Sequence, residues 1–237
     1  MQYTGYIENF FERYLICIFI MDDIIYTDNA YRLMDVCGID EAGRGPVIGP
    51  MVMAILCGNE ETIKNLGVRD SKKLSPSRRL YLYGELIKYK YKFYIISPAE
   101  IDKYVREKKL NILEEKYAMM LINHAENDVY IDCFDTDEKR LENKLIFETK
   151  KKITCKHHAD NLFPIVSGAS IIAKVIRDKE ISKLHEIYGD FGSGYPSDIR
   201  TINFLKNSIK TKMDINGIVR TEWKTYKNLK TQNYKFI

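Results

Sequence analysis

Residues 38–45 read Gly-Ile-Asp-Glu-Ala-Gly-Arg-Gly and place two adjacent carboxylates, Asp40 and Glu41, at the end of a short apolar strand. These side chains would point to opposite sides of an ideal strand, so a shared metal site requires the strand to bend or end here. The turn Gly43-Arg44-Gly45 permits a bend, because glycine adopts backbone conformations that other residues avoid. Its glycines also expose backbone N–H groups to a ligand. This pattern indicates metal-dependent phosphate chemistry.

The stretch closely resembles the opening signature of ribonuclease HII, the type 2 ribonuclease H family. The likeness continues without a break through residues 46–52, Pro-Val-Ile-Gly-Pro-Met-Val. A second family signature, in which an aspartate precedes a serine- and alanine-rich helix, resembles residues 158–175 and places Asp160 as that aspartate. The agreement of two long segments makes a chance match untenable.

Shorter segments extend the resemblance to roughly residues 35–228. Residues 191–198, Phe-Gly-Ser-Gly-Tyr-Pro-Ser-Asp, and residues 70–75, Asp-Ser-Lys-Lys-Leu-Ser, are similar to two further signatures. Residues 220–225, Arg-Thr-Glu-Trp-Lys-Thr, resemble an arginine-x-x-tryptophan segment of the archaeal and eukaryotic branches. The tryptophan is expected to anchor the C-terminal helix rather than to stack on a base.

Two positions depart from the family pattern. Gly168 stands where an alanine is usual, and Ile199 stands where a proline is common. Glycine in a helix interior costs up to about 1 kcal/mol relative to alanine, so Gly168 is expected to loosen the start of its helix slightly.

The resemblance implies a quartet of catalytic and metal-binding carboxylates: Asp40, Glu41, Asp132 and Asp160. Taken alone, Asp132 ends an apolar strand and is most simply a turn or cap residue. Hard oxygen ligands suit Mg²⁺ or Mn²⁺, and two such ions about 4 Å apart can assist an in-line displacement at phosphorus. Without metal the carboxylates would repel one another, so their pKa values should rise and the site should loosen. Asp178 is expected to pair with Lys174.

The resemblance also implies substrate-binding residues. Only the 2′-hydroxyl distinguishes RNA from DNA at a given nucleotide. In this family the turn equivalent to Gly43, Arg44 and Gly45 senses that hydroxyl, and the tyrosine matching Tyr195 packs on the neighbouring deoxyribose at an RNA-to-DNA junction. Lys72 or Lys73 is a candidate phosphate contact, with an exposed basic turn as the equal alternative.

Alternating apolar runs predict an α/β fold with a mixed five-stranded sheet flanked by helices and a C-terminal helical segment. The first expected strand is the short apolar one that ends at Asp40 and Glu41, and the others cover residues 47–57, 92–97, 128–132 and 152–155. One helix is expected over residues 110–125, with a core-facing stripe of Leu113, Tyr117, Met120 and Leu121. Another opens after Pro164, with Ser167 or Ser170 as its N-cap. This order is compatible with the ribonuclease H-like fold that the resemblance implies.

Three regions are expected along the 237 residues. Residues 1–33 form an N-terminal extension, and the native chain is expected to begin at Met34, where simple family members start. Residues 34–190 form the catalytic domain, and residues 191–237 form a helical, basic substrate-binding segment. From Lys206 onward eight basic residues face two acidic ones, although the whole chain carries a net charge of only +4. A basic segment suits a phosphate backbone, and a solvated helical face is the plainer alternative.

Composition points to the cytoplasm. Five cysteines, an odd number without a Cys-x-x-Cys pair, predict reduced and mostly buried thiols rather than a disulfide framework or a zinc site. The longest apolar run, residues 14–21, is too short to span a membrane, and its flanks are unlike those of a secretory signal.

We therefore predict an archaeal-style ribonuclease HII that hydrolyses the RNA strand of RNA/DNA hybrids and incises 5′ of ribonucleotides embedded in duplex DNA. The resemblance implies a two-metal-ion reaction with Mg²⁺ or Mn²⁺ that leaves a 3′-hydroxyl and a 5′-phosphate. The chain is expected to act as a monomer in replication and repair, with a sliding clamp as a further partner. Two alternatives are a catalytic subunit that depends on partner subunits and a hybrid-binding protein without catalysis. A ribonuclease HIII is disfavoured, because its last carboxylate and its larger N-terminal domain differ.

Overall fold

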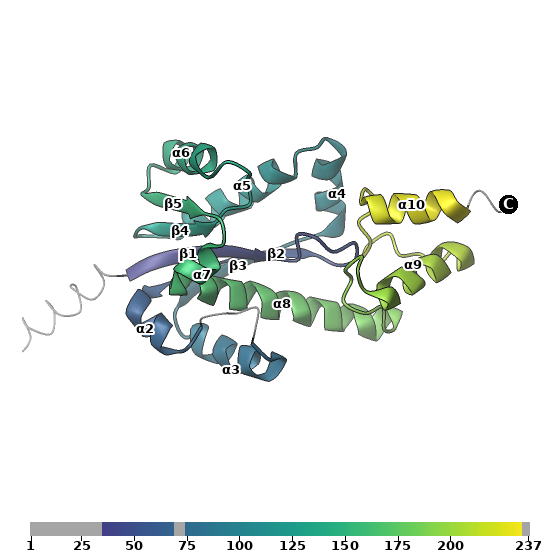
Figure 1. Cartoon of the computed structure of the whole chain (residues 1–237), viewed down its shortest axis with the longest axis horizontal. Helices are drawn as coiled ribbons and strands as arrows, with labels where there is room; N and C mark the ends of the chain where they lie inside the picture. The colour runs from purple at the N-terminus through teal and green to yellow at the C-terminus, as the bar shows by residue number, and fades with distance from the viewer. Residues whose placement is uncertain (1–34, 69–73, 234–237) are drawn as a thin grey trace, which may run out of the picture.

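A mixed sheet forms the centre of the computed structural model, which describes residues 35–68 and 74–233 (Figure 1). Within these residues the sheet has five strands in the order β3-β2-β1-β4-β5. β1 pairs antiparallel with β2 and β2 with β3, whereas β1, β4 and β5 run parallel. The predicted mixed five-stranded sheet is confirmed. The strands are β1 Asp35–Ala42, β2 Met51–Asn59, β3 Lys90–Ile96, β4 Val129–Asp132 and β5 Ile153–Lys156.

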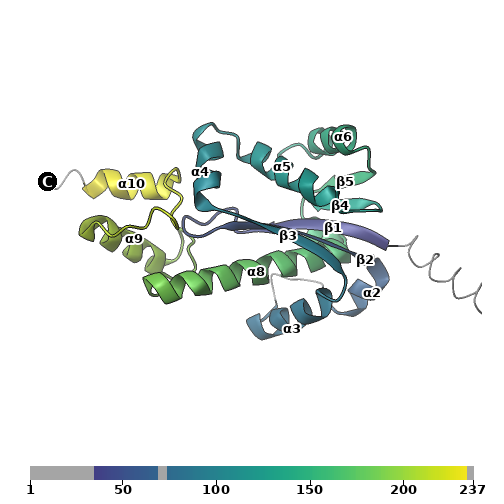
Figure 2. The ribbon, with the colours of Figure 1, turned by 180° about the vertical axis from the view of Figure 1, so that it is seen from behind.

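Helices cover both faces of the sheet, as Figures 1 and 2 show. This coverage explains why β2 is apolar at nearly every position, since a strand buried on both faces does not alternate. One face packs on α4 Pro98–Arg106, α5 Leu110–Ile122 and α6 Glu138–Thr149. The other face packs on α2 Glu60–Asn65, α3 Pro76–Leu86, α7 Ala159–Leu162 and α8 Pro164–Tyr188.

The predicted core stripe of α5 is confirmed. Leu113, Tyr117 and Leu121 are buried, and Met120 packs partly buried against the same cluster. The second strand begins later than predicted, at Met51, because Val47 and Ile48 enter a separate apolar cluster and Gly49 turns the chain with a φ of +91°.

The start of α8 differs from the prediction. The helix begins at Pro164, with Phe163 as the N-cap and no side-chain capping bond. Proline suits this first position, because its fixed φ is helical and its missing N–H would be unsatisfied there anyway. Ser167 and Ser170 therefore lie inside the helix. The Ser167 hydroxyl donates to the carbonyl of Val68, and Ser170 hydrogen-bonds Asp40.

Close contact between α8 and β1 sets the position of the site. A Cβ atom on Gly38 would lie 2.5 Å from the carbonyl carbon of Ile165, so only glycine admits this approach. Gly168 is also a packing residue, because a Cβ atom there would lie 2.5 Å from Cδ2 of Leu56. The helix thus passes directly over the strand that carries the first two carboxylates.

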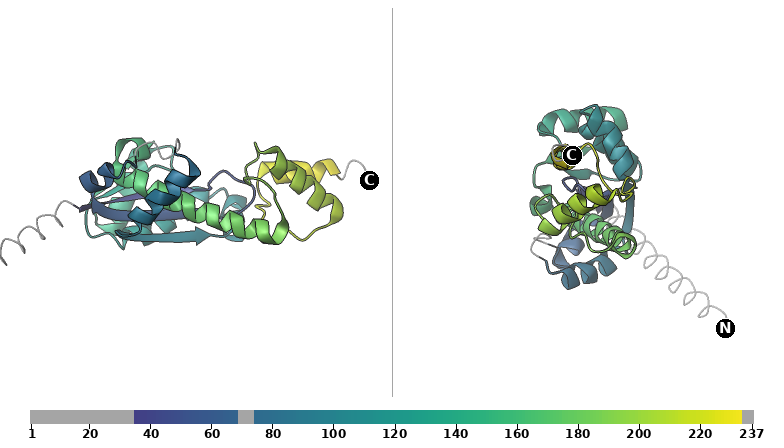
Figure 3. Two further views of the ribbon diagram at one scale, coloured as in Figure 1. Left: turned by 90° about the horizontal axis from the view of Figure 1, so that it is seen from below. Right: turned by 90° about the vertical axis from the view of Figure 1, so that its right-hand side faces the viewer.

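A third apolar cluster lies beyond the end of the sheet, where α9 Ile199–Thr211 and α10 Lys224–Asn233 pack (Figure 3). It joins Val47 and Ile48 of the β1–β2 connection to Phe191, Leu205 and Val219. The division of the chain at residue 190 stays a prediction. The expectations for residues 1–33 and for a start at Met34 concern residues outside the described ranges.

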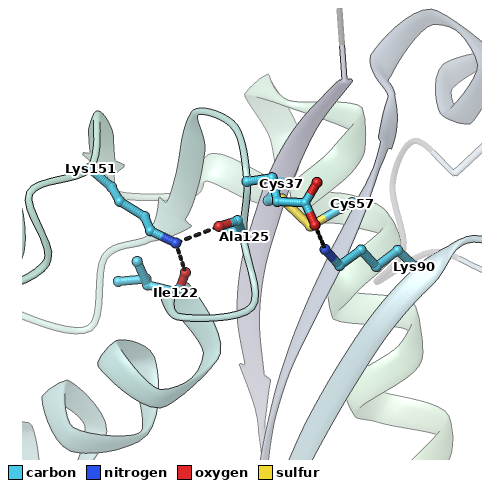
Figure 4. Close-up of a disulfide and its surroundings, with 7 residues drawn as sticks. Cys37, Cys57, Lys90, Ile122, Ala125 and Lys151 are labelled. Carbon is cyan, nitrogen blue, oxygen red and sulfur yellow. Dashed lines mark hydrogen bonds and ion pairs between the residues drawn. A yellow bond between two sulfur atoms is a disulfide. The ribbon is translucent and has the colours of Figure 1, made fainter. Parts of the chain in front are cut away.

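The prediction that all cysteines are reduced is wrong. Cys37 and Cys57 form a disulfide between β1 and β2, beside the bonds that Lys90 and Lys151 make (Figure 4). The two residues face each other in the antiparallel register, with their Cα atoms 4.1 Å apart. Such directly opposed pairs bring side chains closest together. Sequence spacing could not show this pairing, because it depends on the hairpin register. Cys133 and Cys155 are free thiols.

None of the described helices combines the length and the apolar character that a membrane span requires.

Candidate active site

Adjacent strand ends bring the predicted carboxylates together. Asp40 and Glu41 lie near the end of β1, and Asp132 is the last residue of β4, which runs parallel beside it. Asp160 follows β5 on the short helix α7. The Ala159 backbone N–H donates to Oδ1 of Asp132 at 2.9 Å, which ties the end of β4 to the segment that holds Asp160. Ligand sites of open α/β sheets collect at such carboxyl ends.

The carboxylates affect one another electrostatically. Burial, followed by the charges of Asp132 and Asp160, raises the pKa of Asp40 to about 8, although hydrogen bonds from Ser170 and the Glu41 N–H oppose the rise. Burial, then Asp40 and Glu114, also raise the pKa of Glu41 well above its ordinary value, while Arg44 lowers it. The predicted rise in pKa is confirmed for these two residues.

The donor set fits a hard divalent cation. Carboxylate oxygens are the preferred ligands of Mg²⁺ and Mn²⁺, and a cation would relieve the repulsion that raises the two pKa values. Within residues 35–68 and 74–233, however, no three His, Cys, Asp or Glu side chains are already gathered tightly enough to hold one ion. The residues therefore fit the metal by their chemistry, and metal binding would draw them closer.

Arg44 is held by the protein on one side. Its Nε donates to Oε1 of Glu114 at 2.6 Å and its Nη2 to Oε2 at 3.1 Å, with a further bond of 2.9 Å to Oδ1 of Asn111. Glu114 is fully buried on α5. The side chain of Arg44 is still 40% exposed, so part of it faces solvent. A bidentate pair of this kind fixes the guanidinium plane.

Glu114 was not predicted as a site residue from the sequence. The available signal was its position within the apolar stripe of α5, three, four and seven residues before Tyr117, Ala118 and Leu121.

Two residues near the C-terminus hold the carbonyl groups of the turn. Arg220 is fully buried and donates to the carbonyls of Gly43 at 2.5 Å and Arg44 at 2.8 Å, and burial lowers its pKa to about 9. Trp223 Nε1 donates to the carbonyl of Gly45 at 3.0 Å. All three carbonyls of the turn are thus engaged. The Arg-x-x-Trp segment was visible in the sequence as a family feature. Its contacts with the turn could not be predicted, because they depend on the fold.

Tyr195 lies beside the turn, in the lining of the same cleft. A Cβ atom on Gly45 would lie 3.7 Å from Cε1 of Tyr195, and the guanidinium of Arg177 lies 5.2 Å from the centre of the tyrosine ring. Arg177 is buried and also packs under Gly43, whose φ is +84°. Its importance was not visible in the sequence, where it is one polar residue of a long helix.

A cleft of about 390 Å³ joins these groups. Its lining combines Glu41 and the Gly43–Gly45 turn with Ser170 and Lys174 of α8 and with Tyr195. Lys174 also pairs with Asp178 at 2.7 Å, as predicted. Lys72 and Lys73 lie outside the described residues. The structure therefore brings the first motif and Tyr195 to one cleft.

Comparisons with known proteins agree with the fold. The family model described as Ribonuclease HII matches residues 37–226. A Ribonuclease HII of Picrophilus torridus is 57% identical over 197 residues, which is 83% of this chain and 98% of the relative. The solved ribonuclease H2 of Pyrococcus horikoshii superposes with a TM-score of 0.79 at 40% identity, covering 85% of this chain and all of that one.

A further solved structure is a PCNA:RNase HII complex from Archaeoglobus fulgidus, with a TM-score of 0.77 at 41% identity and coverage of 82% and 96%. Sheet order and helix placement define a protein with the ribonuclease H-like fold. The chain belongs to the ribonuclease HII family, and its relatives are archaeal. It is therefore a ribonuclease H endonuclease that acts on RNA/DNA hybrids, and it belongs to a metal-dependent family of hydrolases.

Proposed function

We propose that the enzyme also incises 5′ of single ribonucleotides embedded in duplex DNA, and that it cleaves with two metal ions to leave a 3′-hydroxyl and a 5′-phosphate. The observation that carries this proposal is the shared cleft of Glu41, the Gly43–Gly45 turn and Tyr195. A turn and an aromatic ring side by side in one cleft can contact one ribonucleotide and the sugar beside it. Recognition of a lone ribonucleotide needs both contacts.

Asp40, Glu41, Asp132 and Asp160 would hold two Mg²⁺ or Mn²⁺ ions. When bound, such ions stabilise the charge that develops at phosphorus and activate water. The chain itself supplies orientation. Ser170 and the Glu41 N–H hold the carboxylate of Asp40, and the Ala159 N–H holds that of Asp132. The turn, kept in place by Arg220 and Trp223, presents its groups to the 2′-hydroxyl.

The test is Mg²⁺-dependent cleavage of a labelled DNA duplex with one ribonucleotide, beside a duplex with four or more consecutive ribonucleotides. Incision on the 5′ side of the lone ribonucleotide would support the full proposal. Cutting of the longer run alone would remove the junction-recognition part. Cutting of neither would favour a partner-dependent subunit or a binding protein. An Asp40→Asn variant should lose turnover and retain hybrid binding, and comparable activity in that variant would refute its assignment.

The remaining expectations join this proposal. The enzyme acts as a monomer in the cytoplasm, with residues 34–190 as the catalytic domain and residues 191–237 as a basic substrate-binding segment. A sliding clamp is a further partner, because a similar protein from Archaeoglobus fulgidus was solved as a complex with PCNA. Co-elution of the purified chain with an archaeal PCNA in size-exclusion chromatography would test the clamp, and its elution alone would test the monomer.

A further inference from the structure

A second hollow lies on the other side of the turn. It has a volume of about 550 Å³ and lies between the α4–α5 connection and the start of α10, two segments that lie near each other in Figures 1 and 2. Arg44 lines both this hollow and the cleft, so the turn forms the ridge between them. We refer to the second hollow as the basic groove. Its charged lining residues are Arg44, Lys108, Lys109, Glu222 and Lys224.

The charge of the basic groove is only partly neutralised from within, by the pairing of Arg44 with Glu114. Lys108 and Lys224 are exposed, and neither forms an ion pair with any residue in the described parts of the chain. The one lining acid, Glu222, is already engaged by Arg106 at 3.1 Å and by Lys227. Lys109 pairs with Glu107 at 2.8 Å, but both side chains are about half exposed, and such surface pairs exchange readily for another anion. The groove is therefore ready to accept negative charge.

Lys108 lies in the connection that follows α4. It has a φ of +58°, a left-handed conformation that is common where a helix ends, and Lys150 and Lys212 adopt it after α6 and α9. This conformation closes the helix, and the assignment of Lys108 to the groove rests on its exposed position in the lining.

Trp223 gives the groove a fixed wall. Its indole N–H is bonded to the carbonyl of Gly45, and the guanidinium of Arg220 lies 4.9 Å from its ring centre. The indole is therefore attached to the turn that lines the cleft. A duplex presents two phosphate backbones, and a basic surface beside the turn can neutralise phosphates that lie outside the cleft.

We propose that the basic groove binds backbone phosphates of the duplex outside the cut site, with Lys108 and Lys224 as the principal contacts. This inference rests on the proposed function, since it assigns the groove to the same substrate. Phosphate contacts of this kind set register and affinity rather than sequence preference. The groove thus positions the duplex so that the ribonucleotide reaches the turn.

A matched pair of double variants tests the proposal. Lys108→Gln/Lys224→Gln removes both groove cations. Lys92→Gln/Lys150→Gln is the control, because both residues are exposed lysines away from the groove, without ion pairs in the described chain, and Lys150 has a φ of +57° like that of Lys108. Both variants lose the same charge and one left-handed lysine.

Binding of a duplex with one ribonucleotide is measured by fluorescence anisotropy in EDTA over a series of KCl concentrations. The groove variant should raise Kd on the order of tenfold and flatten the slope of log Kd against log salt by about 1 to 2. The control should keep the slope of the wild type within about 0.3. Equal slopes for the two double variants would overturn the proposal.

Neutral methylphosphonate linkages identify the strand. They are placed beside the ribonucleotide, in the cut strand of one duplex and in the complementary strand of another. In the strand that the groove binds, they should weaken binding to the wild type but cause no further weakening with the groove variant. Either strand supports the proposal, whereas additive effects in both strands would overturn it. Wild-type incision is measured beside these assays. Its absence would refute the proposed function, while intact incision with an unchanged groove variant would refute the groove alone.

Discussion

Asp40 keeps its proton over a range in which an ordinary aspartate has lost it. The folded protein holds the proton up to about pH 8, whereas the unfolded chain releases it near pH 3.8. In metal-free protein the free energy of unfolding should therefore fall as pH rises between these values, by at most about 1.4 kcal/mol per pH unit for this proton.

An Asp40→Asn variant lacks this titration and should lose less stability than the wild type between pH 4 and pH 8. Thermal melts in EDTA at a series of pH values measure the difference. The variant should gain in melting temperature over the wild type as pH rises. Parallel curves for the two proteins would contradict the burial and repulsion that raise the pKa of Asp40.

Arg177 contacts both Tyr195 and the Gly43–Gly45 turn, the two features that we propose bind the substrate. Its guanidinium lies over the ring of Tyr195, its Nη2 donates to the carbonyl of Ser193 at 3.3 Å, and its Nε has no hydrogen-bond partner among the described residues. We expect Arg177→Met, which keeps most of the packing volume, to reduce cleavage at a lone ribonucleotide on the order of tenfold more than cleavage of a long ribonucleotide run. Arg177→Lys should restore part of the loss, because a cation over the ring remains.

Steady-state assays on both substrates and a thermal melt of each variant check the role of Arg177. Removing a buried charge need not lower stability, so a selective loss of lone-ribonucleotide cleavage with an unchanged melt would support a positioning role. An equal loss on both substrates that follows the melting temperature would show a structural role instead.

For single residues, the sequence predicted those that belong to a recognisable motif. It did not predict those that contact the turn from distant parts of the chain. Asp40 and Glu41 could be named from two adjacent letters. Glu114, Arg177 and Arg220 could not, because each reaches the turn from a helix or loop far along the chain.

At the scale of elements, two glycines allow α8 to pack on the sheet, and they should differ in sensitivity. A methyl group at Gly38 would meet the backbone of Ile165, which cannot move without shifting α8, so Gly38→Ala should destabilise the protein by more than about 3 kcal/mol. A methyl group at Gly168 would meet the end of the Leu56 side chain, which can change rotamer.

Gly168→Ala should therefore cost about 1 to 2 kcal/mol or less, since the better helix propensity of alanine offsets part of the overpacking. Urea unfolding of both variants measures the two free energies. A larger cost for Gly168→Ala than for Gly38→Ala would contradict this account. The expectation that Gly168 only loosens a helix start overlooked its contact with β2, which no local pattern reveals.

The apolar runs in the sequence predicted which segments form strands, but they did not predict where each strand begins and ends. Val47 and Ile48 are as apolar as the residues after Met51, and their assignment to another cluster depends on Val219 and Phe191. The start of α8 was misplaced for a related reason: two serines offered plausible caps, and the proline ahead of them was the stronger signal.

For the whole molecule, the disulfide joins two central strands, and its loss should be measurable. Crosslinking residues 20 apart in sequence restricts the unfolded chain and stabilises the fold by about 3 kcal/mol on the chain-entropy estimate. We expect Cys37→Ala/Cys57→Ala to lower the free energy of unfolding by roughly that amount. A reductant should lower the melting temperature of the wild type and leave that of the variant unchanged. A wild type indifferent to reductant would contradict the crosslink.

This crosslink also changes one inference about the whole chain. Because Cys37 and Cys57 are paired, the cysteine pattern no longer supports a reducing compartment, and the cytoplasmic location rests on the proposed role alone. The overall fold was nevertheless predictable, because the order of strands and helices and the family motifs agreed along most of the chain.

The disulfide also turns part of the backbone into a covalent ring. The ring runs from Cys37 to Cys57 and encloses Asp40, Glu41 and the Gly43–Gly45 turn. A single peptide-bond break within it opens the ring without releasing a fragment, since the two pieces stay joined through sulfur. The segment with Asp40 and Glu41 therefore remains attached to both parts of the molecule even after the hairpin that carries it has been cut.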